Sequence, residues 1–130
     1  MTNIDVETLR REEIVDISEK VRDIVQNDFS NDAKACLVYV GHTTCAIMVQ
    51  ENYDSDVNLD ILTFLKKNVP NVGWRHSEGN SDSHIKAALI GPSKIIPVEN
   101  GKLLLGQWQG ISLCEFDGAR NRSIRVIELQ

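Results

Sequence analysis

The sequence has no excess of positive charge and no long hydrophobic run. Its 130 residues include 14 lysines and arginines against 19 aspartates and glutamates, a formal net charge of −5, and the sequence pI is about 5.1. Without a basic stripe the chain cannot neutralise a run of phosphates, so we do not expect a nucleic-acid partner. No apolar stretch reaches the roughly 18–20 residues of a membrane helix, and residues 1–11 lack the apolar centre of a signal peptide. A cytoplasmic protein without a membrane partner is therefore expected.

Cysteine is also scarce. Cys36, Cys45 and Cys114 are odd in number, far apart and form no C-x-x-C pair. This pattern favours buried, reduced thiols over a disulfide framework.

The length and composition are those of one globular domain. The chain is 42% hydrophobic and 25% charged, and it contains no linker, repeat or low-complexity tract. Residues 1–130 are therefore predicted to form a single domain with one core.

Hydrophobic spacing divides this domain into helices and strands. Apolar residues recur at helical intervals in 16–26 and 57–67, and a short helix is predicted over 83–90. Asp16 and Glu19 are interpreted as a capping box for the first of these helices. Runs rich in β-branched residues predict strands at 34–40, 45–50, 95–98, 102–105, 111–116 and 123–129. The pattern predicts an α+β fold, an antiparallel β-sandwich with two or three flanking helices.

The three histidines are the first candidates for chemistry. His42 occupies a polar break between two predicted strands, and His76 and His84 flank a polar segment that enters a predicted helix. Three neutral imidazoles with one open position are a common catalytic zinc geometry. The spacing matches neither H-E-x-x-H nor paired C-x-x-C, so separate local hydrogen bonds remain the alternative.

A second group of polar residues runs from Glu51 and Asn52 to Asp60. These side chains could supply a general base or orient metal-bound imidazoles. Asp56 precedes the predicted helix at Val57, and we interpret it as that helix's cap.

A third group is the segment Gly106-Gln107-Trp108-Gln109-Gly110. Two glycines around an aromatic residue and two amides could bring backbone close to a ligand. A bulge between strands is the alternative.

Taken in order, the polar segments form three motifs. The first is His42-Thr43-Thr44 with Glu51-Asn52 and Asp60, and the second is His76-x-Glu78-Gly79-Asn80-Ser81-Asp82-x-His84. The third and most specific runs from Ser93 through Gly101 to Gly106-x-Trp108-Gln109-x-Ile111, then Glu115-Phe116-Asp117-Gly118 and Arg120. In these motifs the sequence resembles the YjbQ family over nearly its whole length. It departs from the family at Gln107, Ala119 and Cys45, where Thr, Pro and Ala are usual, and none of the three is a candidate ligand.

The resemblance implies a compact β-sandwich that assembles as a homotrimer around a pocket for a divalent metal ion, with zinc the first candidate. It also implies a secondary thiamine-phosphate synthase activity, in which a pyrimidine diphosphate is joined to a thiazole phosphate, so the partner is a small phosphorylated metabolite. The alternative is a non-catalytic protein that binds a metal or a phosphorylated metabolite. The residues carried over are His42, His76 and His84 for the metal, Glu51, Asp60 and Arg120 for catalysis, and Asn52, Asn80, Lys86, Trp108 and Gln109 for the substrate. For Arg120 a structural ion pair is equally open.

Overall fold

The computed structural model describes residues 2–130, which form eight strands and three helices. In chain order these are β1 (Thr2–Glu7), β2 (Glu13–Asp16), α1 (Ser18–Asp28), β3 (Ala35–Val40), β4 (Cys45–Glu51), α2 (Ser55–Asn68), α3 (Ser81–Ile90), β5 (Ser93–Glu99), β6 (Lys102–Leu103), β7 (Gln109–Glu115) and β8 (Asn121–Leu129).

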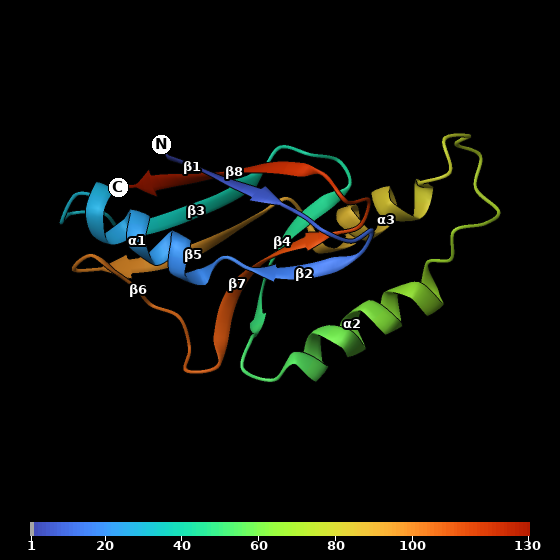
Figure 1. Ribbon diagram of the computed structural model, residues 1–130. Coiled ribbons are helices and arrows are strands. Elements are labelled where there is room, and N and C mark those ends of the chain that lie inside the picture. Colours follow the sequence, from blue (N-terminus) through green and yellow to red (C-terminus); the bar gives the residue numbers. More distant parts are fainter. Residues whose placement is uncertain (1) are drawn as a thin grey trace.

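The strands form two curled antiparallel sheets. One has the order β1-β8-β3-β5-β6 and the other the order β2-β7-β4. Figure 1 shows α1 beside β6 at one end of the sheets, and α2, α3 and the loop that joins them at the other end. The predicted α+β class, with antiparallel sheets and flanking helices, is confirmed.

The main core lies between the two sheets and α1. Val38, Ile47, Leu113 and Ile124 come from four different strands and are fully buried there, beside Val21 of α1. Burying one such side chain stabilises the fold by about 1.5–3 kcal/mol relative to leaving it exposed. The alternating burial of β3 and β8 follows from this core on one face of their sheet.

A second, smaller core covers the opposite face of the three-stranded sheet. Ala46, Cys114 and Phe116 pack there against Leu65 of α2 and Ala87 of α3. Since both faces of this sheet are covered, β7 is buried continuously from its second residue to its last. This second core attaches α3, with its histidine, to the start of β4.

The strand prediction differs from the structure at β6 and at β2. The strand expected over 102–105 ends at Leu103, and β2 was not anticipated. β2 has only two apolar residues, Ile14 and Val15, and it forms because it pairs with β7 along its whole length. Sequence periodicity over four residues cannot indicate such a long-range pairing.

Both predicted helix caps are corrected. The N-cap of α1 is Ile17, and Asp16 instead accepts hydrogen bonds through Oδ1 from the backbone N and Oγ of Ser18, at 2.9 and 2.6 Å. At α2 the cap is Asp54, whose Oδ1 accepts from the backbone N of Asp56 at 2.9 Å. Asp56 lies inside the first turn, because the helix begins two residues earlier than its apolar pattern.

None of the helices among residues 2–130 is long and apolar enough to cross a membrane.

The three cysteines are free and buried. Burial raises the pKa of Cys36 and Cys114 to about 12 and that of Cys45 to about 11. A thiol with a raised pKa stays protonated and is a poor nucleophile at pH 8. We predict that none of the three reacts with an aromatic disulfide reagent at pH 8 until urea unfolds the chain. Rapid labelling of one thiol in the folded protein would contradict this.

Candidate metal and ligand site

The three histidines lie along one end of the molecule. His84 is in the first turn of α3, and its ring centroid is 5.4 Å from that of His76, with an interplanar angle of 83°. His84 also shares with His42 a shallow pocket of about 440 Å³, bordered by Tyr39 and Pro92. The structure therefore brings all three predicted ligands to one surface, with His84 between the other two.

Each of the outer histidines has a local hydrogen-bond partner. His76 Nδ1 is 2.9 Å from Ser81 Oγ, at the start of α3. His42 Nε2 accepts a hydrogen bond of 3.1 Å from the backbone N of Ser123 in β8. These contacts fix the orientation of two imidazoles from loops, His76 against α3 and His42 against β8.

Burial lowers the pKa of His42 below its ordinary value, and the Arg122 guanidinium lowers it further, while Glu115 acts in the opposite direction. A neutral imidazole is the form that binds a metal ion. The lowered pKa favours the neutral imidazole of His42.

The spacing of His76 and His84 fits two ligands of one ion. Two imidazoles that bind one tetrahedral zinc through nitrogens at about 2.0–2.1 Å have ring centroids roughly 5 Å apart. The observed 5.4 Å agrees with that geometry. Within residues 2–130 no group of three or more His, Cys, Asp or Glu side chains is arranged to hold a metal ion, and the metal site remains a prediction.

An ionic cluster joins α3 to the segment that precedes β2. Asp82 Oδ1 accepts from Arg11 at 3.0 Å, and Asp82 Oδ2 accepts from Lys86 Nζ at 3.1 Å. Lys86, only 1% exposed, also donates to Glu12 Oε1 at 3.1 Å. The ammonium of Lys86, which was predicted to bind substrate, is therefore paired with two carboxylates. Burial alone raises the pKa of Asp82, but the hydrogen bonds from Arg11 and Lys86 outweigh burial and leave that pKa below its ordinary value.

Asn80 and Arg120 meet at Asp117. Asn80 Nδ2 donates to Asp117 Oδ2 at 2.9 Å, and Arg120 donates to the same oxygen at 3.0 Å and through Nε to the Asp117 carbonyl at 2.7 Å. Arg120 thus forms the ion pair that the sequence left open. Asn80 Oδ1 is buried and has no hydrogen-bond partner among residues 2–130, so it is an acceptor available to a ligand donor or a cation.

Four other predicted residues gather at the far end of β4. Gln109 pairs with Glu51 across the β4–β7 ladder, and the backbone N of Asn52 donates to the Trp108 carbonyl at 3.2 Å. Asn52 Nδ2 also donates to Asp16 Oδ2 at 3.0 Å. A Cβ on Gly110 would collide with the Asn52 side chain, which explains one glycine of this motif.

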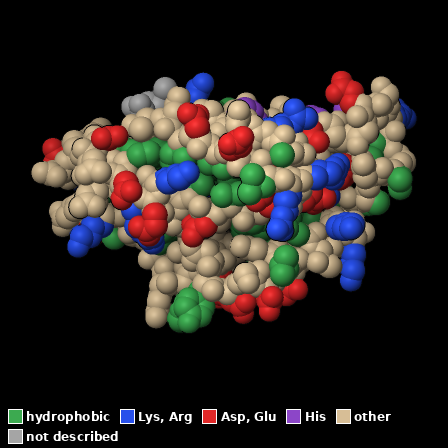
Figure 2. Space-filling view, viewed as in Figure 1, with side chains coloured by type: hydrophobic (Ala, Val, Ile, Leu, Met, Phe, Trp, Pro, Cys, Tyr) green, Lys and Arg blue, Asp and Glu red, His purple; other side chains and the backbone are tan. Residues whose placement is uncertain are grey.

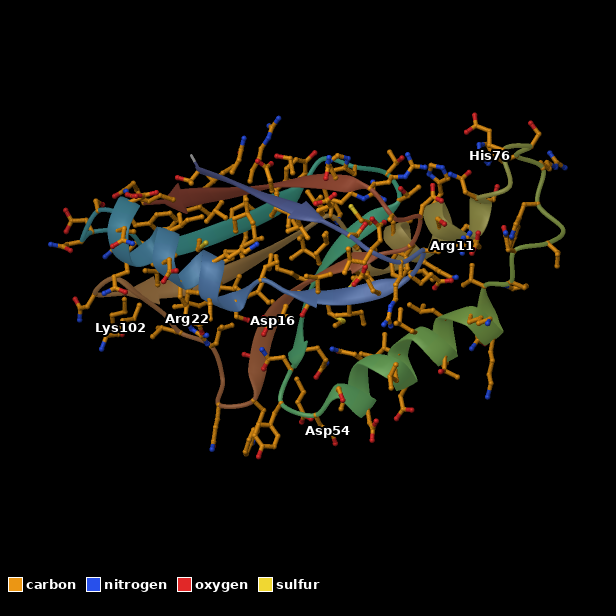
Figure 3. All side chains as sticks on the ribbon, viewed as in Figure 1. Arg11, Asp16, Arg22, Asp54, His76 and Lys102 are labelled. Atoms are coloured by element: carbon orange, nitrogen blue, oxygen red, sulfur yellow. The ribbon has the colours of Figure 1, made fainter. Side chains whose placement is uncertain are left out.

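This second group is well separated from the histidines. The seven residues of β4 put roughly 20 Å between Cys45, beside the histidine pocket, and Glu51. In Figure 3 His76 lies at one end of the molecule, well away from Asp54, which precedes the first residue of α2. Asp60 lies on the exposed side of α2, bordering an apolar groove with Val57 and Phe64. Within one chain the predicted site residues therefore lie in two separate groups, one around the histidines and one at the far end of β4.

Sequence reasoning missed the residues that support the histidines. Arg11 and Glu12 are 71 and 74 residues away from their partners Asp82 and Lys86. Arg122 joins Glu115 in a second buried ion pair. The only signal was charge at positions that strand alternation would bury, as at Arg122 between Asn121 and Ser123.

Together, the two sheets, the helices at both ends and the surface of three histidines define a small α+β protein with a candidate metal-binding end. The family model described as "UPF0047 protein YjbQ-like" matches residues 2–129. The chain belongs to the YjbQ family, which confirms the resemblance in its motifs.

Two relatives match this chain over most of their sequences. The chain is 44% identical to a UPF0047 protein of Methanocaldococcus jannaschii over 93% of this chain and 88% of that protein. It is 39% identical to the UPF0047 protein YugU of Bacillus subtilis, over 97% of this chain and 96% of YugU.

Solved structures of the family have the same fold. A crystal structure of an uncharacterized YjbQ/UPF0047 protein from Clostridium acetobutylicum matches with a TM-score of 0.95 and 42% identity, over 99% of this chain and 100% of that one. A structure from Sulfolobus solfataricus, described as a YbjQ-like protein of unknown function, gives a TM-score of 0.93 and 35% identity, over 99% and 96%.

We predict that His42 titrates below the roughly 6.5 of an exposed imidazole. Since the unfolded chain then binds this proton at a higher pH than the folded chain, His42 lowers the stability of the fold as the pH falls below about 6.5. NMR titration of the imidazole carbons measures the midpoint, and His42→Gln should remove this part of the pH dependence. A midpoint at or above 6.5 would show that burial does not control this residue.

The ionic cluster gives a second prediction. Asp82→Asn leaves the buried Lys86 ammonium with Glu12 alone, and breaking a buried pair in this way costs about 3–5 kcal/mol. Lys86→Met should cost less, because Asp82 keeps Arg11. Urea unfolding of both variants measures the difference, and a larger loss for Lys86→Met would contradict the assignment.

Proposed function

We propose that this chain is a metal-binding enzyme of the YjbQ family that acts on a small phosphorylated metabolite. The observation that supports the proposal is the arrangement of the histidines, with His76 and His84 at the spacing of two ligands of one ion and His42 in the pocket that His84 also lines. Zinc is the first candidate metal.

The family resemblance makes thiamine-phosphate synthase chemistry the specific reaction to test. A thiazole phosphate nitrogen would attack the methylene carbon of a pyrimidine diphosphate, so that a C–N bond forms and pyrophosphate leaves with the electrons of the broken C–O bond. A bound divalent ion would supply positive charge to the departing pyrophosphate. The proposal also includes assembly of the chain as a homotrimer, as the family resemblance implies.

The protein's own residues would have the following tasks. The three histidines hold the ion, and Ser81 and the Ser123 backbone orient His76 and His42. Arg120, half-exposed beside Asp117, offers a guanidinium edge to a phosphate. Glu51 and Asp60 are the candidate bases, and Asn52, Asn80, Lys86, Trp108 and Gln109 are the candidate substrate contacts.

A specific observation also favours the second candidate function, a non-catalytic protein that binds a metal or a phosphorylated metabolite. The candidate catalytic cation and the candidate substrate-binding cation are both already paired, Arg120 with Asp117 and Lys86 with Asp82 and Glu12. A site for pyrophosphate release would benefit from uncommitted positive charge.

The histidine variants test the metal site. His42→Ala, His76→Ala and His84→Ala should each strongly lower the metal content of protein purified without an affinity tag or chelator. The melting temperature of the metal-free form should change little, because the hydrophobic core lies elsewhere. Ser81→Ala removes only the partner of His76 and should cause an intermediate loss, about 10–100-fold in metal affinity. Full metal retention in two of the three single variants would overturn the shared site.

Turnover separates the two candidate functions. Metal-loaded protein, mixed with the pyrimidine diphosphate and the thiazole phosphate, should release pyrophosphate and thiamine phosphate in equal amounts, and the triple histidine variant should not. Stoichiometric metal without turnover would favour the binding protein.

A further inference from the structure

The end of the molecule away from the histidines carries a pocket that the proposed function does not use. The pocket has a volume of about 430 Å³ and lies between α1 and the turn that joins β5 to β6. Small-molecule sites have volumes of roughly 300–1,000 Å³. The polar side chains that line it come from three segments of the chain: Arg22 and Gln26 of α1, Asn31 of the loop after α1, and Asn100 and Lys102 of the β5–β6 hairpin.

Two regular elements hold the walls of this pocket in place. Arg22 and Gln26 are one helical turn apart on α1, so their side chains share a face of that helix. On the facing wall β5 and β6 are joined by a two-residue turn, in which Asn100 and Gly101 have φ angles of 52° and 76°. Turns of this kind match the twist of the two strands and hold a hairpin in one conformation. The backbone of both walls is therefore fixed before a ligand binds, which lowers the entropic cost of binding.

The charged residues that line the pocket are both cations. Arg22 uses one guanidinium nitrogen in an exposed ion pair with Glu19 of the same helix, and such pairs are weak enough for a ligand to compete. Lys102 has no ion-pair partner among the residues that the structure describes. Figure 3 shows Arg22 on α1 near Lys102 on β6, at the opposite end of the molecule from His76. Two cations in one concave surface that no carboxylate lines favour an anionic ligand.

Amide side chains supply the remaining polar lining. Gln26, Asn31 and Asn100 are exposed, and each amide offers two donors and an acceptor. Asn31 and Asn100 also line a neighbouring pocket of about 470 Å³, so the two pockets are continuous at these amides. Hydroxyl groups both donate and accept, and therefore match such amides. Figure 2 shows charged side chains of both signs over α1 and β6, with little hydrophobic surface between them. A small polar ligand fits this surface better than a protein partner does.

We propose that this pocket binds a small phosphorylated polyol. The phosphate lies between Arg22 and Lys102, where the guanidinium offers two parallel donors and the ammonium adds a second positive charge. A phosphate monoester carries a charge of about −1.5 to −2 at neutral pH, which two cations match better than they match a single carboxylate. The hydroxyl groups bind the amides of Gln26, Asn31 and Asn100. This site needs no metal ion and does not depend on the function proposed for the histidines.

NMR titration of the metal-free protein tests the site. Glycerol phosphate, added to isotope-labelled protein in EDTA, should cause saturable shifts of the amide signals of Gln26, Asn31 and residues 99–103. Signals around His42 and His84 should not move. Glycerol alone should cause no saturable shift at the same concentrations, because it lacks the charged group. Failure of the signals to saturate, or shifts confined to the histidine end, would show that the pocket is not a site for this class of ligand.

Charge variants test the position of the phosphate. Arg22→Gln and Lys102→Gln each remove one cation at an exposed position, so the amide spectrum should remain that of a folded protein. Each should weaken the binding of glycerol phosphate by about 10-fold or more. The matched control is Lys20→Gln, which removes the same charge from an exposed position of α1 outside the pocket and should change the affinity by less than about two-fold. Equal weakening in all three variants would indicate attraction by overall charge and reject the site.

Amide variants test the contacts to the hydroxyl groups. Wild type should bind glycerol phosphate more tightly than inorganic phosphate, and Gln26→Ala and Asn31→Ala should reduce this difference. Asn27→Ala, an exposed neighbour on α1 outside the pocket, should preserve it. Equal affinity of the wild type for the two ligands would reject the polyol as the ligand.

The triple histidine variant separates this inference from the proposed function. With His42, His76 and His84 all replaced by Ala, the protein should bind glycerol phosphate as tightly as the wild type, because the pocket lies at the other end of the sheets. Failure of the wild type to bind metal would count against the proposed function and leave this expectation unchanged. Loss of glycerol phosphate binding in the folded triple variant would instead contradict a separate site.

Discussion

The carboxylate of Glu115, at the end of β7, connects Thr8 after β1 with Arg122 in β8. Its Oε1 accepts from Thr8 Oγ at 2.7 Å and from Arg122 Nε at 2.8 Å, and its Oε2 accepts from the backbone N of Asp117 at 3.0 Å. Arg122 in turn donates to Thr44 Oγ at 2.8 Å. Burial alone raises the pKa of Glu115, but these hydrogen bonds keep it below its ordinary value. Such a pair is costly to bury and more costly to break, so it fixes where these segments end.

The position of the histidines depends on this contact. Thr44 lies two residues after His42 and directly before β4, and Arg122 precedes Ser123, whose backbone N donates to His42. The second ionic cluster, around Asp82, holds α3 against Arg11 and so sets His84 and the loop of His76. The buried ion pairs therefore orient the polar residues at the margin of the sheets.

Helix α2 has a different relation to the fold. It joins the two ends of the divided site, yet it contributes little to the core and presents apolar residues outward. The face of an amphipathic helix that is not buried in its own fold stays exposed to solvent. In α2 this exposed apolar face lies between an acidic residue in the first turn, Asp56, and two basic residues in the last turn, Lys66 and Lys67.

The sequence alone determined the α+β class, the three helices and most strands, because local periodicity reports which face of an element is buried. It also identified the family and the three histidines as candidate metal ligands, since both depend on residue types along the chain. Only the tertiary structure decided that β2 exists, that Lys86 is bound by Asp82 and Glu12, and that Glu51 and Asn52 stand apart from His76. Those facts follow from contacts between residues far apart in the chain, and a one-dimensional pattern carries no distance between such residues.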